Sequence, residues 1–132
     1  MADIGDVVSS ALAPHDSGVG RFEIDGPTSR LTSRQALGLS LALHELATNA
    51  AKYGALSGDN GKVEIKWNVE EDGAFRFSWS ESGGPQVSVP TRVGFGSQLI
   101  RRMVAPYFDG EAYLDYDPYG VRFTLSGKLI SK

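Results

Sequence analysis

Residues 32–54 read TSRQALGLSLALHELATNAAKYG, and this stretch carries the longest unbroken apolar pattern of the chain. Thr32, followed three residues later by Gln35, matches a capping box, in which each side chain bonds the other residue's backbone at a helix start. Apolar residues then recur at helical spacing until Gly54, the type of residue expected just past a helix end. The sequence therefore predicts one long helix, Ser33–Tyr53.

The predicted helix has two different faces. At about 100° per residue, its polar side chains share one sector and its apolar side chains share the opposite one. An apolar face of this kind packs on a sheet. The polar sector is then free for chemistry, although a solvated helix surface shows the same pattern. The polar sector holds His44, Glu45, Thr48, Asn49 and Lys52, and the apolar face holds Ala36, Leu39, Leu43, Leu46, Ala47 and Ala50.

Composition restricts the class of protein. The 132 residues, 41% hydrophobic and 22% charged, fit one globular domain. The absence of cysteine excludes disulfide scaffolds, thiolate zinc sites and cysteine nucleophiles. A net charge of -3 disfavours nucleic-acid binding. No apolar run reaches the roughly 18–20 residues of a membrane-spanning helix. We therefore expect a cytoplasmic domain with no membrane contact.

Apolar spacing also predicts the other elements. Alternating residues indicate five strands, arranged as one single strand and two antiparallel hairpins. Helical spacing indicates two shorter helices. The expected fold is α/β (α+β), a two-layer sandwich of a mixed, mainly antiparallel sheet of about five strands and three helices. The strands are expected over 21–25, 63–69, 75–79, 112–116 and 121–125, and the shorter helices over 3–12 and 99–104.

Three polar residues of the long helix suggest a phosphate site. Glu45 and Asn49 are four residues apart, so their side chains reach the same point beside the helix, and Lys52 follows one turn later. An amide oxygen suits Mg²⁺, which takes few protein ligands and uses substrate phosphates and water for the rest. The carboxylate can orient a nucleophile or a water molecule, and the lysine supplies positive charge for phosphate oxygens.

A glycine-rich stretch, Gly94-Phe95-Gly96-Ser97, precedes the last predicted helix. Glycines at a helix N-terminus present free backbone N–H groups and a favourable dipole to an anion. The stretch equally fits a flexible linker. Neither the Rossmann fingerprint nor the Walker A pattern is present, so these two nucleotide folds are excluded.

A second candidate is Glu81, which follows Trp79 at the expected end of a strand and leads into Gly83. Glycines here permit close approach of a ligand. The carboxylate can accept a hydrogen bond from an exocyclic amine, or it can be an ordinary turn residue. The tryptophan is expected to belong partly to the core.

Taken together, the segments HELATNAAKYG, WSESGGP and GFGSQLI resemble, in this order, the N, G1 and G2 boxes of the GHKL ATPase superfamily. More narrowly, the chain is similar to the catalytic domain of HWE histidine kinases, named for an N-box His and a G1-box Trp-x-Glu. The similarity covers essentially the whole chain and implies the Bergerat (GHKL) fold. Those three residues are His44, Trp79 and Glu81 here.

The resemblance implies roles for the helix residues. Asn49 matches the asparagine that ligates Mg²⁺ between ATP phosphates, Lys52 a phosphate contact, and Tyr53 an aromatic side chain beside the nucleotide. Glu45 occupies the acidic N-box position. In related ATPases that carboxylate orients the attacking water, whereas in histidine kinases it assists the phosphoacceptor imidazole, and both roles stay open. His44 is either a catalytic residue or a local hydrogen-bonding one.

The resemblance also implies how the two ends of ATP are held. Glu81 replaces the G1 aspartate that accepts a hydrogen bond from the adenine amino group, and Gly83 lets the base lie close. Thr124 is expected to line the adenine pocket. The G2 glycines Gly94 and Gly96, with Phe95 and Ser97 beside them, flank the triphosphate, and residues 85–93 form a short lid in which Arg92 contacts phosphate.

We therefore expect the ATP-binding catalytic domain of a two-component sensor histidine kinase. It transfers the γ-phosphoryl group of Mg-ATP to a histidine on a phosphoacceptor domain of the same or a partner chain, with a response regulator downstream. His15 follows Pro14 in a turn and is expected at the surface, so the phosphoacceptor and sensor segments are expected outside these 132 residues. The fragment alone is expected to be monomeric.

Two other functions stay open at this point. One is a non-catalytic nucleotide-binding or degenerate phosphotransfer module with the same fold. The other is an anti-sigma serine kinase of the same superfamily, which shares the nucleotide pocket but phosphorylates a serine on a partner protein. The Trp79-x-Glu81 signature and the short lid disfavour the serine kinase.

Overall fold

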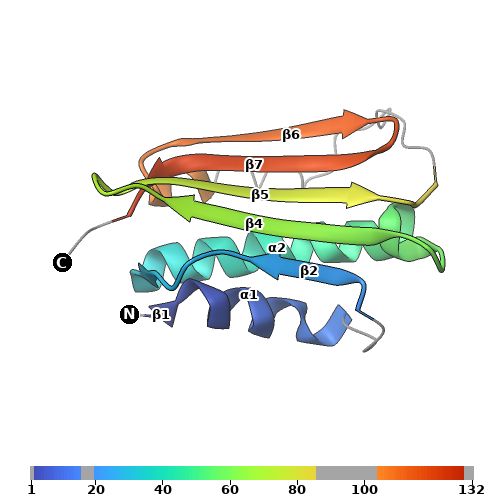
Figure 1. Ribbon diagram of the computed structural model, residues 1–132, viewed down its shortest axis with the longest axis horizontal. Helices are drawn as coiled ribbons and strands as arrows, with labels where there is room; N and C mark the ends of the chain where they lie inside the picture. The colour runs from blue at the N-terminus through green and yellow to red at the C-terminus, as the bar shows by residue number, and fades with distance from the viewer. Residues whose placement is uncertain (1, 16–19, 86–103, 130–132) are drawn as a thin grey trace.

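The computed structural model describes residues 2–15, 20–85 and 104–129. Its main sheet has the order β2-β4-β5-β7-β6, so β5 is the central strand (Figure 1). The β2–β4 pair is parallel and the other three pairs are antiparallel, which confirms the mixed, mainly antiparallel sheet. The strands are β2 (Phe22–Asp25), β4 (Lys62–Val69), β5 (Ala74–Ser82), β6 (Glu111–Asp117) and β7 (Gly120–Lys128).

The long helix, α2 (Ser33–Tyr53), has the predicted bounds. Its capping box is complete, because the Thr32 hydroxyl accepts from the Gln35 backbone N–H at 3.1 Å and the Gln35 side-chain oxygen accepts from the Thr32 backbone N–H at 3.0 Å. Gly54 closes the last turn by donating its N–H to the Ala50 carbonyl at 3.0 Å. Local capping therefore defines both ends of the helix.

The first helix, α1 (Ile4–Leu12), packs beside α2 and is followed by the short helix η1 (Ala13–His15). A small sheet of β1 (Ala2–Asp3) and β3 (Arg30–Leu31), together with a second short helix, η2 (Ala55–Ser57), was not predicted. Two- and three-residue elements are too short to produce a hydrophobic period. Among the described residues, none of the helices is both long and apolar enough to span a membrane.

Most of the helix predicted over 99–104 lies outside the described residues. Residues 104–107 are helical, so helical structure includes Pro106 and extends past the predicted end at residue 104. Tyr107 packs on α2 at Gly38, where a Cβ atom would lie 2.5 Å from the tyrosine ring, and the Arg34 guanidinium lies 4.9 Å from the centre of that ring.

The helices cover one face of the main sheet, and the core lies between them (Figure 1). Along β5, Phe75, Phe77 and Trp79 face this core, and Phe123 of β7 pairs with Trp79. Each large apolar side chain buried in this way stabilises the fold by about 1.5–3 kcal/mol. The predicted two-layer sandwich is therefore confirmed.

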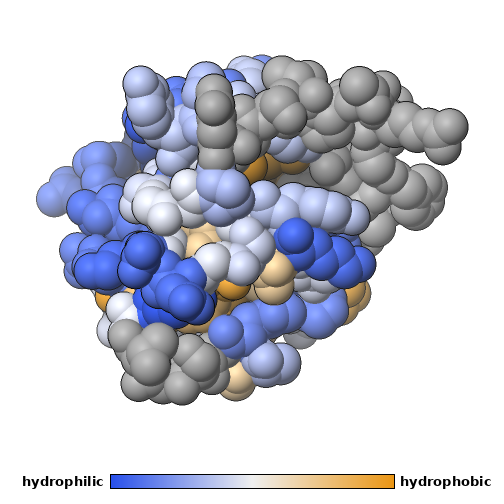
Figure 2. Space-filling model, turned by 90° about the vertical axis from the view of Figure 1, so that its right-hand side faces the viewer, coloured by the Kyte–Doolittle hydropathy of each residue, from blue (hydrophilic) through white to orange (hydrophobic). Residues whose placement is uncertain are grey.

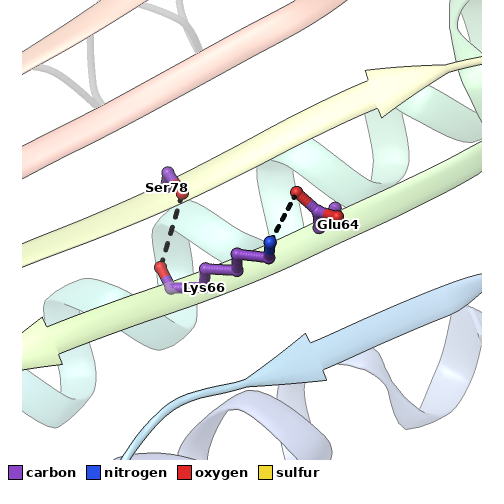
Figure 3. A network of polar contacts seen from close by, with 3 residues as sticks. All are labelled: Glu64, Lys66 and Ser78. Carbon is purple, nitrogen blue, oxygen red and sulfur yellow. Dashed lines mark hydrogen bonds and ion pairs between the residues drawn. The ribbon is translucent and has the colours of Figure 1, made fainter.

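The opposite face of the sheet is polar. Figure 3 shows three of its residues, in which Lys66 Nζ lies 3.4 Å from Glu64 Oε1 and the Ser78 hydroxyl lies 3.5 Å from the Lys66 carbonyl oxygen. Exposed ion pairs of this kind contribute little to stability. The alternation along β4 and β5 thus separates a core face from a solvated face.

Candidate active site

The side chain of Glu81 joins the central strand to the end of α2. It is 6% exposed. Its Oε1 atom accepts a hydrogen bond from the backbone N–H of Ala55 at 2.9 Å, and its Oε2 atom accepts one from Nε1–H of Trp79 at 2.9 Å. Ala55 directly follows Gly54, which closes α2. The carboxylate is therefore held at the C-terminal end of the long helix.

The place of Glu81 follows from the strand's alternation. The structure extends β5 to Ser82, whereas the sequence predicted that this strand ends at residue 79, so Glu81 lies inside the strand on the core-facing side with Trp79. Burial raises the pKa of the Glu81 carboxyl, while the hydrogen bonds from Ala55 and Trp79 lower it. A buried carboxylate needs such donors, because desolvation is costly for an unpaired charge.

Glycines leave room for this junction. A Cβ atom on Gly54 would collide with Glu81 Oε1, and one on Gly84 would lie 2.6 Å from the Ala55 Cα atom. Gly83 has a φ of 74°, which favours glycine, and a Cβ there would lie 2.8 Å from the Asn60 carbonyl oxygen. The backbones of η2 and the β5 exit therefore approach more closely than side chains would allow.

Arg21 holds the other side of the same turn, a role that sequence reasoning missed. Its Nη2 atom donates to the carbonyl oxygens of Ala55 at 2.8 Å and Gly58 at 2.5 Å, and its Nε atom donates to the carbonyl of Gly61 at 2.9 Å. Ala55 thus donates its N–H to Glu81 and accepts from Arg21. No sequence pattern marks this contact, because its acceptors are backbone carbonyls more than 30 residues away.

The polar sector of α2 lies away from the sheet, as predicted. Glu45 and Asn49 are half-buried, whereas Lys52 and Tyr53 are exposed, the latter by 73%. The last two stand directly before Gly54 and therefore beside the Glu81 junction. Asn49 is one turn earlier and Glu45 one turn before that, so the candidates form a row leading to the end of the helix.

His44 lies against His15, with ring centroids 5.4 Å apart. The sequence placed His15 at the surface, but the structure half-buries it and leaves its Nε2 atom buried with no hydrogen-bond partner among the described residues. Burial, and then the charge of His44, lower the pKa of His15. The backbone carbonyl of His44 accepts from the Thr48 hydroxyl at 2.8 Å.

The prediction for Thr124 is corrected by the sheet register. Thr124 pairs with Ser78 and lies on the solvated face, whereas Trp79 and Glu81 occupy the core face. Strict alternation along β7 gives this result, since Phe123 is buried on the core side. The β7 residue opposite Glu81 on this core face is the half-buried Val121, because the adjacent residues Arg122 and Ser80 are paired.

Five candidate residues lie outside the described residues, and the structure does not address their predicted roles. They are Arg92, Gly94, Phe95, Gly96 and Ser97.

Figure 2 looks onto the end of the molecule where α2 and β5 end, and there hydrophobic side chains come to the surface among hydrophilic ones. This end combines apolar surface, Glu81 and the last turn of α2.

Comparison with curated proteins finds blue-light-activated histidine kinases. That of Brucella anthropi is 40% identical over 122 residues, which cover 89% of this chain and 25% of the relative. That of Brucella abortus is 39% identical over 133 residues, which cover 98% of this chain and 26% of the relative. The chain thus spans about a quarter of the length of these relatives. No family model matches it.

Solved structures share the fold. The histidine kinase domain of the Erythrobacter litoralis blue-light-activated histidine kinase EL346 matches with a TM-score of 0.73 at 17% identity, covering 95% of this chain and 58% of that one. The catalytic domain of histidine kinase ThkA matches at 0.71 and 15% identity, covering 99% and 96%. ThkA in complex with response regulator protein TrrA matches at 0.70 and 16%, covering 98% and 41%.

The fold is therefore that of histidine kinase catalytic domains. Sequence identity near 40% with the Brucella kinases, over almost the whole chain, indicates that the similarity reflects common ancestry. With its N-box His44 and its G1-box Trp79 and Glu81, the chain belongs to the HWE histidine kinases of the GHKL superfamily.

Proposed function

We propose that this domain binds Mg²⁺-ATP and transfers the γ-phosphoryl group to a histidine on a phosphoacceptor domain of the same or a partner chain, in the cytoplasm. The observation that carries the proposal is the contact of Glu81 with Ala55. Through this contact, a buried carboxylate that can hydrogen-bond a nucleobase lies at the same end of the molecule as the polar row of α2. The family relationship supports ATP as the nucleotide.

At the base end, Glu81 accepts a hydrogen bond from the adenine amino group. Each carboxylate oxygen has room for a second donor, and each accepts one protein hydrogen bond here. Tyr53, exposed beside the junction, offers a ring for the nucleotide to pack against. Guanine presents a carbonyl where adenine presents the amine, so the carboxylate disfavours guanine by repulsion between two acceptors.

At the phosphate end, Asn49 fits Mg²⁺ because its amide oxygen is a hard ligand on a half-buried helix face. Bound there with the triphosphate, the metal ion neutralises phosphate charge, which is the main need of phosphoryl transfer. Lys52, in the last turn, adds positive charge for phosphate oxygens. From outside the described residues, Arg92 and the stretch Gly94-Phe95-Gly96-Ser97 complete the triphosphate contacts.

Glu45 acts on the phosphoacceptor. A carboxylate that accepts a hydrogen bond from one imidazole N–H makes the other ring nitrogen a better nucleophile. That nitrogen forms the new bond to the γ-phosphorus while the bond from phosphorus to the oxygen of ADP breaks. The solved complex of ThkA with TrrA supports a response regulator as the next acceptor of the phosphoryl group.

The test is a transfer assay that separates the possible products. The domain is incubated with γ-labelled ATP, Mg²⁺ and the phosphoacceptor domain of a related histidine kinase, and the labelled protein is then exposed to acid or to base. Label that is lost in acid and kept in base is phosphohistidine and supports the proposal. Acid-stable label indicates a serine kinase, and nucleotide binding without any transfer indicates a non-catalytic module.

A further inference from the structure

Trp79 is fully buried, yet it uses its one polar atom at the candidate site. Its side chain is 0% exposed, and its ring packs beside Phe22 with centroids 6.4 Å apart. Its Nε1–H donates to Glu81 Oε2 at 2.9 Å. The two residues are neighbours on the core face of β5, so the strand itself sets their spacing.

We propose that Trp79 is a positioning residue for recognition of the nucleobase, which holds the Glu81 carboxylate aimed at an amino-purine. This inference rests on the proposed function and adds a residue to it. Trp79 does not touch the nucleotide; it acts through Glu81. The Trp-x-Glu pair is then one functional unit, in which the spacing of two matters because both side chains must leave the strand on the same face.

The geometry explains why both donors are needed. Ala55 N–H satisfies Oε1 and the indole N–H satisfies Oε2, so each oxygen is fixed by one partner. If the indole donor is lost, Oε2 becomes an unpaired oxygen of a buried charge, and the carboxyl group is free to rotate or to take up a proton. A protonated carboxyl group has lost one acceptor site for the adenine amine.

Charged side chains on the surrounding elements include Arg21 before β2, Lys52 on α2, Asp59 after η2 and Lys62 on β4. Arg21 bonds the carbonyl side of Ala55, away from its N–H. The pKa of Glu81 is shifted by burial, by Ala55 and by Trp79. Removal of the indole N–H should therefore raise the pKa of Glu81 further.

The chain offers a matched control in Trp67. It lies on the neighbouring strand β4, is 7% exposed, and donates its Nε1–H to the Pro27 carbonyl at 2.8 Å. Trp67→Phe and Trp79→Phe each remove one indole and one hydrogen bond from the same core. Only Trp79→Phe removes a hydrogen-bond donor from Glu81. General damage to the core should therefore affect both variants, whereas loss of positioning should affect Trp79→Phe alone.

The experiment compares the two variants with the wild type in two readouts. The first is the pKa of Glu81 in the nucleotide-free domain, measured by carboxyl ¹³C NMR. The second is calorimetric binding of Mg²⁺-ATP and Mg²⁺-GTP between pH 5 and 8. For Trp79→Phe we expect a raised Glu81 pKa, about a tenfold loss of ATP affinity, a smaller loss for GTP, and an acid limb of ATP binding displaced to higher pH. Trp67→Phe should match the wild type in all of these.

A measurement on the wild type covers the case in which Trp79→Phe does not fold. The indole ¹H–¹⁵N resonance of Trp79 should move with pH along the titration curve of Glu81, and that of Trp67 should not. If the indole resonance of Trp79 does not shift while Glu81 titrates, the inference is overturned.

The outcomes separate the inference from the proposed function. If the wild type binds ATP and Trp79→Phe keeps the wild-type pKa of Glu81 and the wild-type ratio of ATP to GTP affinity, the inference fails alone. If the wild type binds neither nucleotide, the proposed function fails, and the recognition role of Trp79, which rests on it, fails as well.

Discussion

The backbone N–H of Ala55 lies 2.9 Å from Oε1 of Glu81, so a carboxylate on the central strand of the sheet holds the chain one residue past the helix-closing Gly54. This contact joins the two motifs on which the proposed function depends. In the proposed function, the strand supplies the group that recognises the nucleobase, and the helix supplies the groups that contact the phosphates. Each can be tested separately.

Replacement of Glu81 by alanine should weaken ATP binding by at least about tenfold and reduce the preference for ATP over GTP. The amide of Ala55 and the indole of Trp79 also lose their acceptor, so the free energy of unfolding should fall by about 1–3 kcal/mol. Calorimetry with both nucleotides measures the first effect, and urea denaturation the second. Glu64→Ala, on the solvated face, is the control and should change neither. Equal loss of affinity for ATP and GTP would count against recognition of adenine by Glu81.

The change Asn49→Asp should nearly abolish Mg²⁺-dependent ATP binding and transfer, because it places a negative charge where the proposed site has an amide beside the metal ion and the phosphates. Titration of ATP with and without Mg²⁺ measures the effect. Asn68→Asp makes the same chemical change at an exposed position of β4 and should bind ATP normally. Undiminished activity of Asn49→Asp would contradict the metal role.

Glu45→Gln should keep near-normal nucleotide affinity but transfer the phosphoryl group more slowly, by roughly 10²- to 10⁴-fold if the carboxylate acts as a general base on the phosphoacceptor imidazole. Single-turnover transfer with saturating ATP isolates this step. Asn49→Asp provides the contrast, because it should lose affinity as well. An unchanged transfer rate would remove Glu45 from the chemistry.

The sequence predicted most of the architecture because its signals are local. A capping box and a terminal glycine define α2, and alternation defines the faces of the four long strands. The same alternation, carried one step further along β7, would have placed Thr124 on the solvated face and Val121 on the core face. That error came from carrying over the family's residue without following the register.

Other features of the site were beyond sequence reasoning because they depend on tertiary contacts. Arg21 binds backbone carbonyls, which leave no trace in the residue types. The contact of His15 with His44 joins elements that are distant along the chain. The extension of β5 past Trp79 follows from pairing of its last residues with β4, which overrides the glycine-rich sequence beyond.

Arg21→Lys should destabilise the turn over residues 55–61. A lysine ammonium cannot reproduce the planar fork that contacts three carbonyls. We expect a loss of about 2 kcal/mol in the free energy of unfolding, and faster amide hydrogen exchange confined to this turn. Arg76→Lys, at an exposed position of β5, is the control. If both variants exchange alike, Arg21 does not organise the turn.

Stability should depend on pH through His15. Its pKa is lowered in the folded state, first by burial and then by His44, from the 6.5 of an ordinary imidazole, so below pH 6.5 the unfolded chain binds more protons than the folded chain. The free energy of unfolding should therefore fall as the pH drops below 6.5, and His15→Gln should reduce this dependence. Urea denaturation at several pH values measures it. His44→Gln should reduce it in part, and identical pH slopes in wild type and His15→Gln would refute the explanation.

The most direct measurement follows the backbone amide of Ala55 and the indole of Trp79 by ¹H–¹⁵N NMR while a non-hydrolysable ATP analogue is added with Mg²⁺. Both groups already donate to the carboxylate of Glu81. If this carboxylate takes the adenine amine as a further donor, both resonances shift to saturation with the affinity found by calorimetry, and the matching GTP analogue moves them much less. Binding of the ATP analogue that leaves both resonances in place would contradict the account.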